Sequence, residues 1–110
     1  MKKLILLVRR KAGTTHEAFR AYYESTHAPL AQKHLRAHLV RYLRNYLAPL
    51  PGLPAPDYDC VTEFWFADEA ALQTVLAWTR TEEGQVLARD EENFMDRPSM
   101  RVFLAEEAAL

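Results

Sequence analysis

Large apolar side chains occupy both sides of the segment from Tyr58 to Phe66, and this feature most restricts what the chain can fold into. Val61 and Trp65 alternate there with Cys60, Phe64 and Phe66. Successive side chains of a strand point to opposite faces of its sheet, so both faces are predicted to be apolar. Helices of the same chain can cover one face, but a bare apolar face of a few hundred Å² is unusual in a monomer. We therefore expect a homodimer that buries the second face, since twofold dimers are the commonest oligomers.

Three further segments have the pattern of strands. Leu4–Val8 is a short continuous apolar run, which is typical of a strand buried on both faces. Leu39–Leu47 alternates two sets of side chains, and Met100–Ala105 follows a proline. Residues 48–56 contain four of the six prolines and are predicted to form a stiff surface connection.

Helices are predicted in the intervals between these strands. The first is expected to begin near Thr15, because Thr14 and Glu17 have capping-box spacing. Pro29 lacks a backbone N–H and disfavours helical geometry at the residue before it, so this helix should kink or reset just after His27. Caps for a second helix and a further short helix are available at Asp68 and Thr81.

The resulting order, β-α-β-β-α-β with an extra short helix before the last strand, predicts an α+β fold of the ferredoxin-like type. Two strand–helix–strand units then form one four-stranded antiparallel sheet with the helices on one face. A chain of 110 residues suits one domain, so residues 1–110 are expected to form a single unit.

Composition excludes several classes of function. The net charge is −1 with both signs interspersed, so there is no basic stripe for nucleic acid. No run approaches the ~20 apolar residues of a membrane span. Cys60 is the only cysteine, which rules out an intramolecular disulfide and favours the cytoplasm. The three glycines are not clustered, so no nucleotide cofactor is expected. His34 and His38 have i,i+4 spacing, but the helix is expected to end between them, and His27 is about 10 Å from His34 along a helix, so no metal is expected.

Three segments together resemble the EthD family of the dimeric α/β-barrel superfamily over nearly the whole chain. They are Phe19–Leu30, with an aromatic–x3–His–x–Pro pattern; Tyr58–Phe66, followed by Asp68 and Glu69; and Asp90–Asp96, with an Asp–x3–Phe–x–Asp pattern. The resemblance implies two sheets that close into a barrel across a dimer, and a pocket in each subunit between sheet and helices. It also implies relatives that dehydrate, decarboxylate, isomerise or oxidise small aromatic or polyketide-derived compounds, or that only bind them.

His27 is the leading catalytic candidate. It lies about 80° around the helix from Phe19, at the edge of the apolar stripe, where an imidazole can face a pocket mouth. Its unperturbed pKa near ~6.5 suits proton transfer at neutral pH, and the resemblance implies that role for it. Asp90 could orient His27 or bind a substrate hydroxyl. The alternative is that His27 only caps or hydrogen-bonds at the Pro29 kink.

Several other residues are candidates for contact with a small apolar or aromatic ligand. They are Tyr23, Tyr46, Glu63, Trp65 and Phe94. The pKa of Glu63 should be raised beside Trp65 unless the carboxylate is paired, with Arg44 and Arg101 as possible partners. A structural ion pair inside the dimer barrel is the favoured interpretation of Glu63, and aromatic residues on strands are usually core.

Two hypotheses of function follow. The first is a cofactor-independent lyase or isomerase of the EthD type, in which His27 moves a proton on a small aromatic or polyketide-like compound. The second is a non-catalytic binding or accessory protein for a hydrophobic metabolite. Convergence of His27 and Asp90 on an open cavity would favour the enzyme, whereas a histidine bonded to backbone in a closed interior would favour the binding protein. Cofactor-free oxygenation is a third, weaker alternative.

Overall fold

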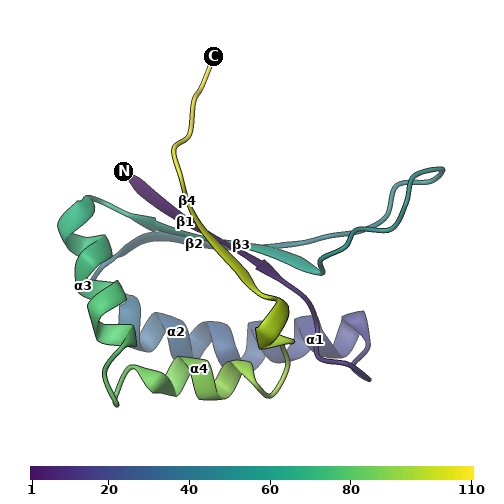
Figure 1. Cartoon of the computed structure of the whole chain (residues 1–110), viewed down its shortest axis with the longest axis horizontal. Coiled ribbons are helices and arrows are strands. Elements are labelled where there is room, and N and C mark those ends of the chain that lie inside the picture. The colour runs from purple at the N-terminus through teal and green to yellow at the C-terminus, as the bar shows by residue number, and fades with distance from the viewer.

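Four strands form one antiparallel sheet in the order β2-β3-β1-β4 in a computed structural model that describes all residues from 1 to 110 (Figure 1). The strands are β1 (Lys2–Val8), β2 (Leu39–Tyr46), β3 (Cys60–Phe66) and β4 (Arg101–Ala105). Each pairs with its neighbours antiparallel, and the two strand–helix–strand units interleave as the sequence order requires. The predicted α+β ferredoxin-like fold is confirmed.

The helices all lie against one face of this sheet, and its other face carries no helix (Figure 1). They are α1 (His16–Tyr22), the π-helical turn η1 (Tyr23–His27), α2 (Ala28–Leu35), α3 (Glu69–Thr79), α4 (Gln85–Glu91) and the 3-10 turn η2 (Arg97–Ser99). None of them combines the length and the apolarity needed to cross a bilayer.

The residues of β3 divide cleanly between the two faces of the sheet. Cys60, Thr62, Phe64 and Phe66 are buried toward the helices, whereas Val61, Glu63 and Trp65 are half-buried on the opposite face. The helix-side residues join a core formed with Phe19, Tyr23, Ala31, Leu35, Leu72, Val75, Leu87 and Phe94. We call the face without helices the open face; it also carries Ile5 and Leu7 of β1, Leu43 of β2 and the half-exposed Phe103 of β4.

The first helical segment differs from its prediction at the π-helical turn. The chain does reset after His27, but Ala28 keeps helical geometry, with φ −62° and ψ −44°, and its N–H donates to the Tyr23 carbonyl. A π turn holds one more residue than an α turn. This wider turn relieves the clash between the ring of Pro29 and the preceding turn of helix, so no kink out of helical geometry is needed.

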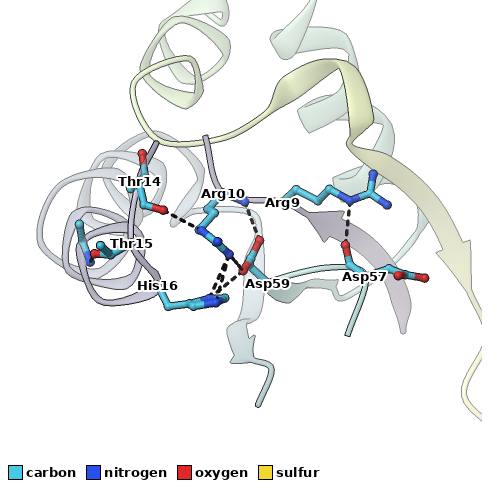
Figure 2. A network of polar contacts seen from close by, with 8 residues as sticks. Arg9, Arg10, Thr14, Thr15, His16, Asp57 and Asp59 are labelled. Atoms are coloured by element: carbon cyan, nitrogen blue, oxygen red, sulfur yellow. Dashed lines mark hydrogen bonds and ion pairs between the residues drawn. The ribbon is translucent and has the colours of Figure 1, made fainter. Parts of the chain in front are cut away.

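Polar contacts fix the start of α1 against the sheet (Figure 2). The Asp59 carboxylate accepts from the backbone N–H of Arg10 at 2.8 Å and from its guanidinium at 3.0 Å, and it contacts His16 Nδ1 at 2.8 Å. Thr15, rather than the Thr14 of the predicted capping box, caps the helix by accepting from the Ala18 N–H at 3.1 Å. These contacts hold the helix that presents Tyr23 and His27 to the sheet.

Candidate active site

His27 and Asp90 meet through a short hydrogen bond although 63 residues separate them. His27 Nδ1 lies 2.7 Å from Asp90 Oδ2, and both side chains are largely buried, with 4% and 14% exposed. Asp90 Oδ1 accepts from the Tyr22 hydroxyl at 2.7 Å and from Asn93 Nδ2 at 3.3 Å. Because the carboxylate can only accept, Nδ1 carries the proton and Nε2 is left with the lone pair that a base needs.

The surroundings of Asp90 keep it ionised. Burial raises the pKa of this carboxyl, but the hydrogen bonds from Tyr22 and His27 outweigh burial and hold the pKa below its ordinary value. The same bond raises the pKa of the Tyr22 hydroxyl, since it stabilises the protonated phenol. The site therefore offers a fixed negative charge behind the imidazole, which stabilises that ring when it gains a proton.

Glu91 lies on the other side of the imidazole. Its Oε2 atom is 3.8 Å from His27 Nε2, and its Oε1 atom accepts from Arg97 Nε at 3.1 Å. Burial raises the pKa of the Glu91 carboxyl, and the neighbouring His27 and Arg97 offset this only in part. The imidazole is thus held between two carboxylates, one with a lowered pKa and one with a raised pKa.

Aromatic rings enclose the imidazole. The Phe94 ring lies 5.0 Å and the Tyr23 ring 5.5 Å from it, measured between centroids. The Tyr23 hydroxyl bonds Thr62 Oγ1 at 2.7 Å, and burial raises the pKa of Tyr23 well above its ordinary value. Tyr23 and Phe94 therefore act on the imidazole as packing partners in this structure, and neither of them lines the cavity described next.

A cavity of about 320 Å³ lies between the sheet and helices α2, α3 and α4. Eleven of its sixteen lining residues are hydrophobic, which makes it an apolar site. Its charged residues are Glu91 and Arg97, and neither His27 nor Asp90 lines it. Glu91 therefore lies between the dyad and the cavity. Three larger hollows on the surface are lined mainly by polar residues and do not include the dyad.

Glu63 and Trp65 lie on the open face, with the sheet between them and the dyad. Glu63 accepts from Trp65 Nε1 at 3.1 Å and from Asn45 Nδ2 at 3.0 Å, and it pairs with Lys3 Nζ at 3.4 Å. Burial raises the pKa of Glu63, but these partners outweigh it and the pKa is lowered. The Glu63 carboxylate is therefore in an ion pair, as expected from the sequence. Its partner is Lys3, however, and not Arg44 or Arg101, the two partners that the sequence had suggested.

Tyr46 faces the helices but not the cavity. Its hydroxyl donates to Glu24, which also binds the guanidinium of Arg44 at 2.8 and 2.9 Å. The Arg44 guanidinium lowers the pKa of Glu24 to about 2, against the opposing effect of burial. This cluster fixes β2 to the helical layer, and the ring of Tyr46 packs edge-on against Tyr23 at 6.1 Å.

Glu91, Arg97 and Tyr42 were not singled out from the sequence. Glu91 adjoins Asp90 within the Asp90–Asp96 segment, and that adjacency is the one signal that could have drawn attention to it. The Tyr42 hydroxyl is the one buried side-chain N or O atom without a hydrogen-bond partner, and its ring stacks on Phe64 at 4.6 Å. No group of three or more His, Cys, Asp or Glu side chains is placed to hold a metal ion.

The chain is similar in sequence and in fold to known proteins. The sequence model of the EthD domain matches residues 11–98. A solved EthD family protein of Bacillus halodurans is 26% identical, with a TM-score of 0.74 over 98% of this chain and 99% of that one. An EthD-like protein of Ralstonia eutropha is 17% identical, with a TM-score of 0.72 over 96% and 89%.

A third solved relative shares the ferredoxin-like fold. A dimeric protein of unknown function with a ferredoxin-like fold, from Bacteroides fragilis, is 10% identical, with a TM-score of 0.61 over 96% of this chain and 95% of that one. At this identity the likeness shows the shared fold alone. Comparison with curated protein sequences gives no significant match.

Proposed function

Because this chain belongs to the EthD domain family, we propose that it is a cofactor-independent enzyme that moves a proton on a small aromatic or polyketide-like compound. The observation that carries the proposal is the 2.7 Å bond between His27 and Asp90 next to an apolar cavity. An imidazole with one nitrogen bonded to a carboxylate and the other free is an arrangement suited to general base catalysis.

The chemistry needs one base and a ligand whose C–H bond is acidified by a carbonyl group. The base takes the proton, and the electron pair of the broken C–H bond moves onto the carbonyl oxygen to give an enolate. Return of the proton to another carbon is isomerisation, and loss of a neighbouring hydroxyl as water is dehydration. Decarboxylation forms the same enolate by loss of CO₂, and the protonated base then supplies the proton. The rings of Tyr23 and Phe94 shield the imidazole from water, so the charge of Asp90 acts strongly on the imidazolium.

Exchange of the acidic hydrogen for deuterium tests this proposal without knowledge of the natural reaction. Enolisable aromatic ketones are incubated with the protein in D₂O, and loss of the C–H signal is followed by NMR. Wild type should accelerate exchange, and His27→Ala should lower the rate by about 100-fold or more. His38→Ala is the matched control, since His38 makes no side-chain hydrogen bond or ion pair and lies outside the dyad. Equal rates for wild type and His27→Ala would refute the role of His27.

A binding function without catalysis is the second candidate, and one observation favours it: the imidazole of His27 does not line the cavity. Under this alternative the protein shelters a hydrophobic metabolite, and the dyad only supports the wall. Wild type would then bind an aromatic ligand without accelerating exchange, and His27→Ala would bind it with unchanged affinity.

We further propose that two copies pack their open faces together. No helix of the chain covers the apolar side chains of this face, among them the half-buried Trp65 and the half-exposed Phe103, and one solved relative with this fold is dimeric. Light scattering should give the mass of two chains for wild type and of one chain for Phe103→Lys. Leu53→Lys, in the proline-rich connection, is the matched control because Leu53 is a similarly exposed apolar residue away from the sheet.

A further inference from the structure

We propose that Glu91, and not His27, is the group that exchanges the proton with the bound molecule, and that Arg97 binds the oxygen on which the negative charge develops. This inference rests on the proposed function and assigns two residues that the family motifs do not include. It also fixes the ligand class: a compact, largely apolar ring ketone whose carbonyl end lies at Glu91 and Arg97.

The position of Glu91 is the first observation. A molecule in the cavity meets Glu91 and Arg97 as the charged groups of the wall, whereas His27 and Asp90 lie behind that wall. The side chain of Glu91 is 12% exposed, and its Oε2 atom is the near neighbour of His27 Nε2 at 3.8 Å. The imidazole of His27 thus lies between the carboxylates of Asp90 and Glu91, and of these three side chains only Glu91 lines the cavity.

The state of Glu91 suits a base in this place. Its carboxyl faces the imidazole of His27, the guanidinium of Arg97 and the apolar cavity. Asp90, on the same helix, adds a negative charge that acts in the same direction as burial. Burial and the charge of Glu91 both raise the pKa of the Tyr42 hydroxyl on β2. Burial raises the pKa of Glu91, which brings its basicity closer to that of a carbon acid activated by a carbonyl. A carboxylate in such surroundings is a stronger base than one in water.

Arg97 completes the requirement for enolisation. Its Nε donates to Glu91 Oε1 at 3.1 Å, and its side chain lines the cavity and is 37% exposed. The remaining guanidinium N–H groups are therefore available beside the base, where they can donate to the oxygen that becomes negative. A base and an oxyanion donor held next to each other are what removal of a proton alpha to a carbonyl demands.

The proton path balances without any further reactant. Glu91 Oε2 takes the proton as the ligand's C–H bond breaks, and the electron pair moves to the carbonyl oxygen on Arg97. The proton then passes to His27 Nε2, and the imidazolium is balanced by Asp90 through Nδ1. The separation of 3.8 Å must close by roughly 0.8–1 Å for this transfer, and such contacts commonly tighten when a ligand binds.

The cavity sets the size of the ligand. A volume of about 320 Å³ is at the lower end of the ~300–1,000 Å³ range of small-molecule sites. Most of its walls are hydrophobic, so the ligand body has to be apolar and its single polar end belongs at Glu91 and Arg97. A bicyclic ketone such as 2-tetralone is a suitable probe, and 2-naphthol is its flat, stable enol analogue.

The experiment measures deuterium exchange into 2-tetralone and, separately, the affinity for 2-naphthol by fluorescence. Glu91→Gln keeps the volume of the side chain and should lower the exchange rate by about 100-fold or more, with 2-naphthol affinity changed by less than about threefold. Glu91→Asp keeps the carboxylate and should restore part of the rate. Glu92→Gln is the matched control, because Glu92 is the adjacent exposed glutamate and does not line the cavity.

Arg97→Gln tests the oxygen-binding half of the proposal. It should weaken binding of the 2-naphtholate anion by about tenfold or more, as loss of a charged hydrogen-bond donor predicts. Leu76→Trp, which fills the cavity, should abolish 2-naphthol binding altogether. If Leu76→Trp abolishes binding while Arg97→Gln leaves the affinity for the anion unchanged, the polar end of the ligand is not at Arg97 and the inference is overturned.

The outcomes separate this inference from the proposed function. If His27→Ala stops exchange while Glu91→Gln exchanges at the wild-type rate, His27 acts directly on the ligand, so the inference fails and the proposed function stands. If wild type does not accelerate exchange into any enolisable ketone, including 2-tetralone, both fail together. Circular dichroism of each variant confirms that a lost rate is not a lost fold.

Discussion

Replacing Asp90 with alanine should destabilise the protein by about 3–4 kcal/mol, because the substitution leaves a buried imidazole without its partner. The bonds to His27 and Tyr22 are both 2.7 Å long, and a hydrogen bond to a charged group contributes about 1.5–3 kcal/mol. The Tyr22 hydroxyl can recover part of its loss from water, since Tyr22 is only half-buried. Asn93, at 3.3 Å and on an exposed residue, adds little.

A double-mutant cycle with His27→Ala isolates the bond itself. The coupling energy between positions 27 and 90 should be about 1.5–3 kcal/mol at pH 7. Urea unfolding followed by circular dichroism measures each variant, at one fixed protein concentration because the stability of an oligomer depends on concentration. With a slope of roughly 1.5 kcal/mol/M, Asp90→Ala should unfold at about 2 M less urea than wild type.

The difference in stability between wild type and Asp90→Ala should shrink as the pH falls. The pKa of Asp90 is lower in the folded protein than its ordinary value, so its contribution is fully present above the pKa of the unfolded chain, near ~3.9. That contribution is lost as pH falls through the folded value. Wild type and Asp90→Ala should therefore converge in stability below about pH 4. A coupling energy under ~0.5 kcal/mol at pH 7, or a difference that does not narrow in acid, would refute the reasoning.

Three substitutions and one chemical modification test the packing around the site. Gly84→Ala should lower Tm by about 10 °C or more in calorimetry, because a Cβ at this position would lie 1.8 Å from the Trp78 carbonyl oxygen; an unchanged Tm would contradict this. Burial raises the pKa of the Cys60 thiol to about 11, so Ellman's reagent at pH 8 should modify native protein at least about 100-fold more slowly than unfolded protein. Tyr42→Phe should leave the free energy of unfolding in urea unchanged, since the Tyr42 hydroxyl has no hydrogen-bond partner. Tyr23→Phe should lower it by about 1–2 kcal/mol, because the Tyr23 hydroxyl bonds Thr62. Equal losses of stability in the two variants would contradict this prediction.

Most of the fold could be predicted because the strands carry their own pattern. The alternation along residues 58–66 correctly separates Val61 and Trp65 from Cys60, Phe64 and Phe66. The geometry around Pro29 could not be predicted, because an α-helical break and a π turn both relieve the same clash and leave the same residues in the sequence. Only the packing of Tyr23 and His27 onto the sheet decides between them.

The candidate site could be predicted in part. Asp90 was expected either to orient His27 or to bind a substrate hydroxyl, and the structure places it 2.7 Å from His27. Glu91 was missed because neighbouring residues on a helix point about 100° apart, so they normally serve different surroundings. At the end of α4, however, Asp90 and Glu91 contact the His27 imidazole from opposite sides. No pattern in the local sequence predicts this arrangement. The sequence also did not show that Glu63 faces away from the helices. Alternation along a strand shows which residues share a face of the sheet, but it does not show which face meets the helices.

In the dimer proposed above, the two faces of the sheet have different roles, because the helices cover one face and a second copy covers the open face. Its central carboxylate, Glu63, has Lys3, Asn45 and Trp65 as partners within one chain. Covering this cluster with a second copy would leave the Glu63 carboxylate paired, which is the condition under which a buried charge is tolerated. Arg41 and Arg101 lie on the same face without an ion-pair partner, so they would have to stay in water at the edge of the contact. Because the sheet separates this cluster from the cavity, Phe103→Lys should abolish association while the bond between His27 and Asp90 persists. Loss of both together would mean that the cavity depends on the partner subunit, and that the helical layer of one chain does not hold the site by itself.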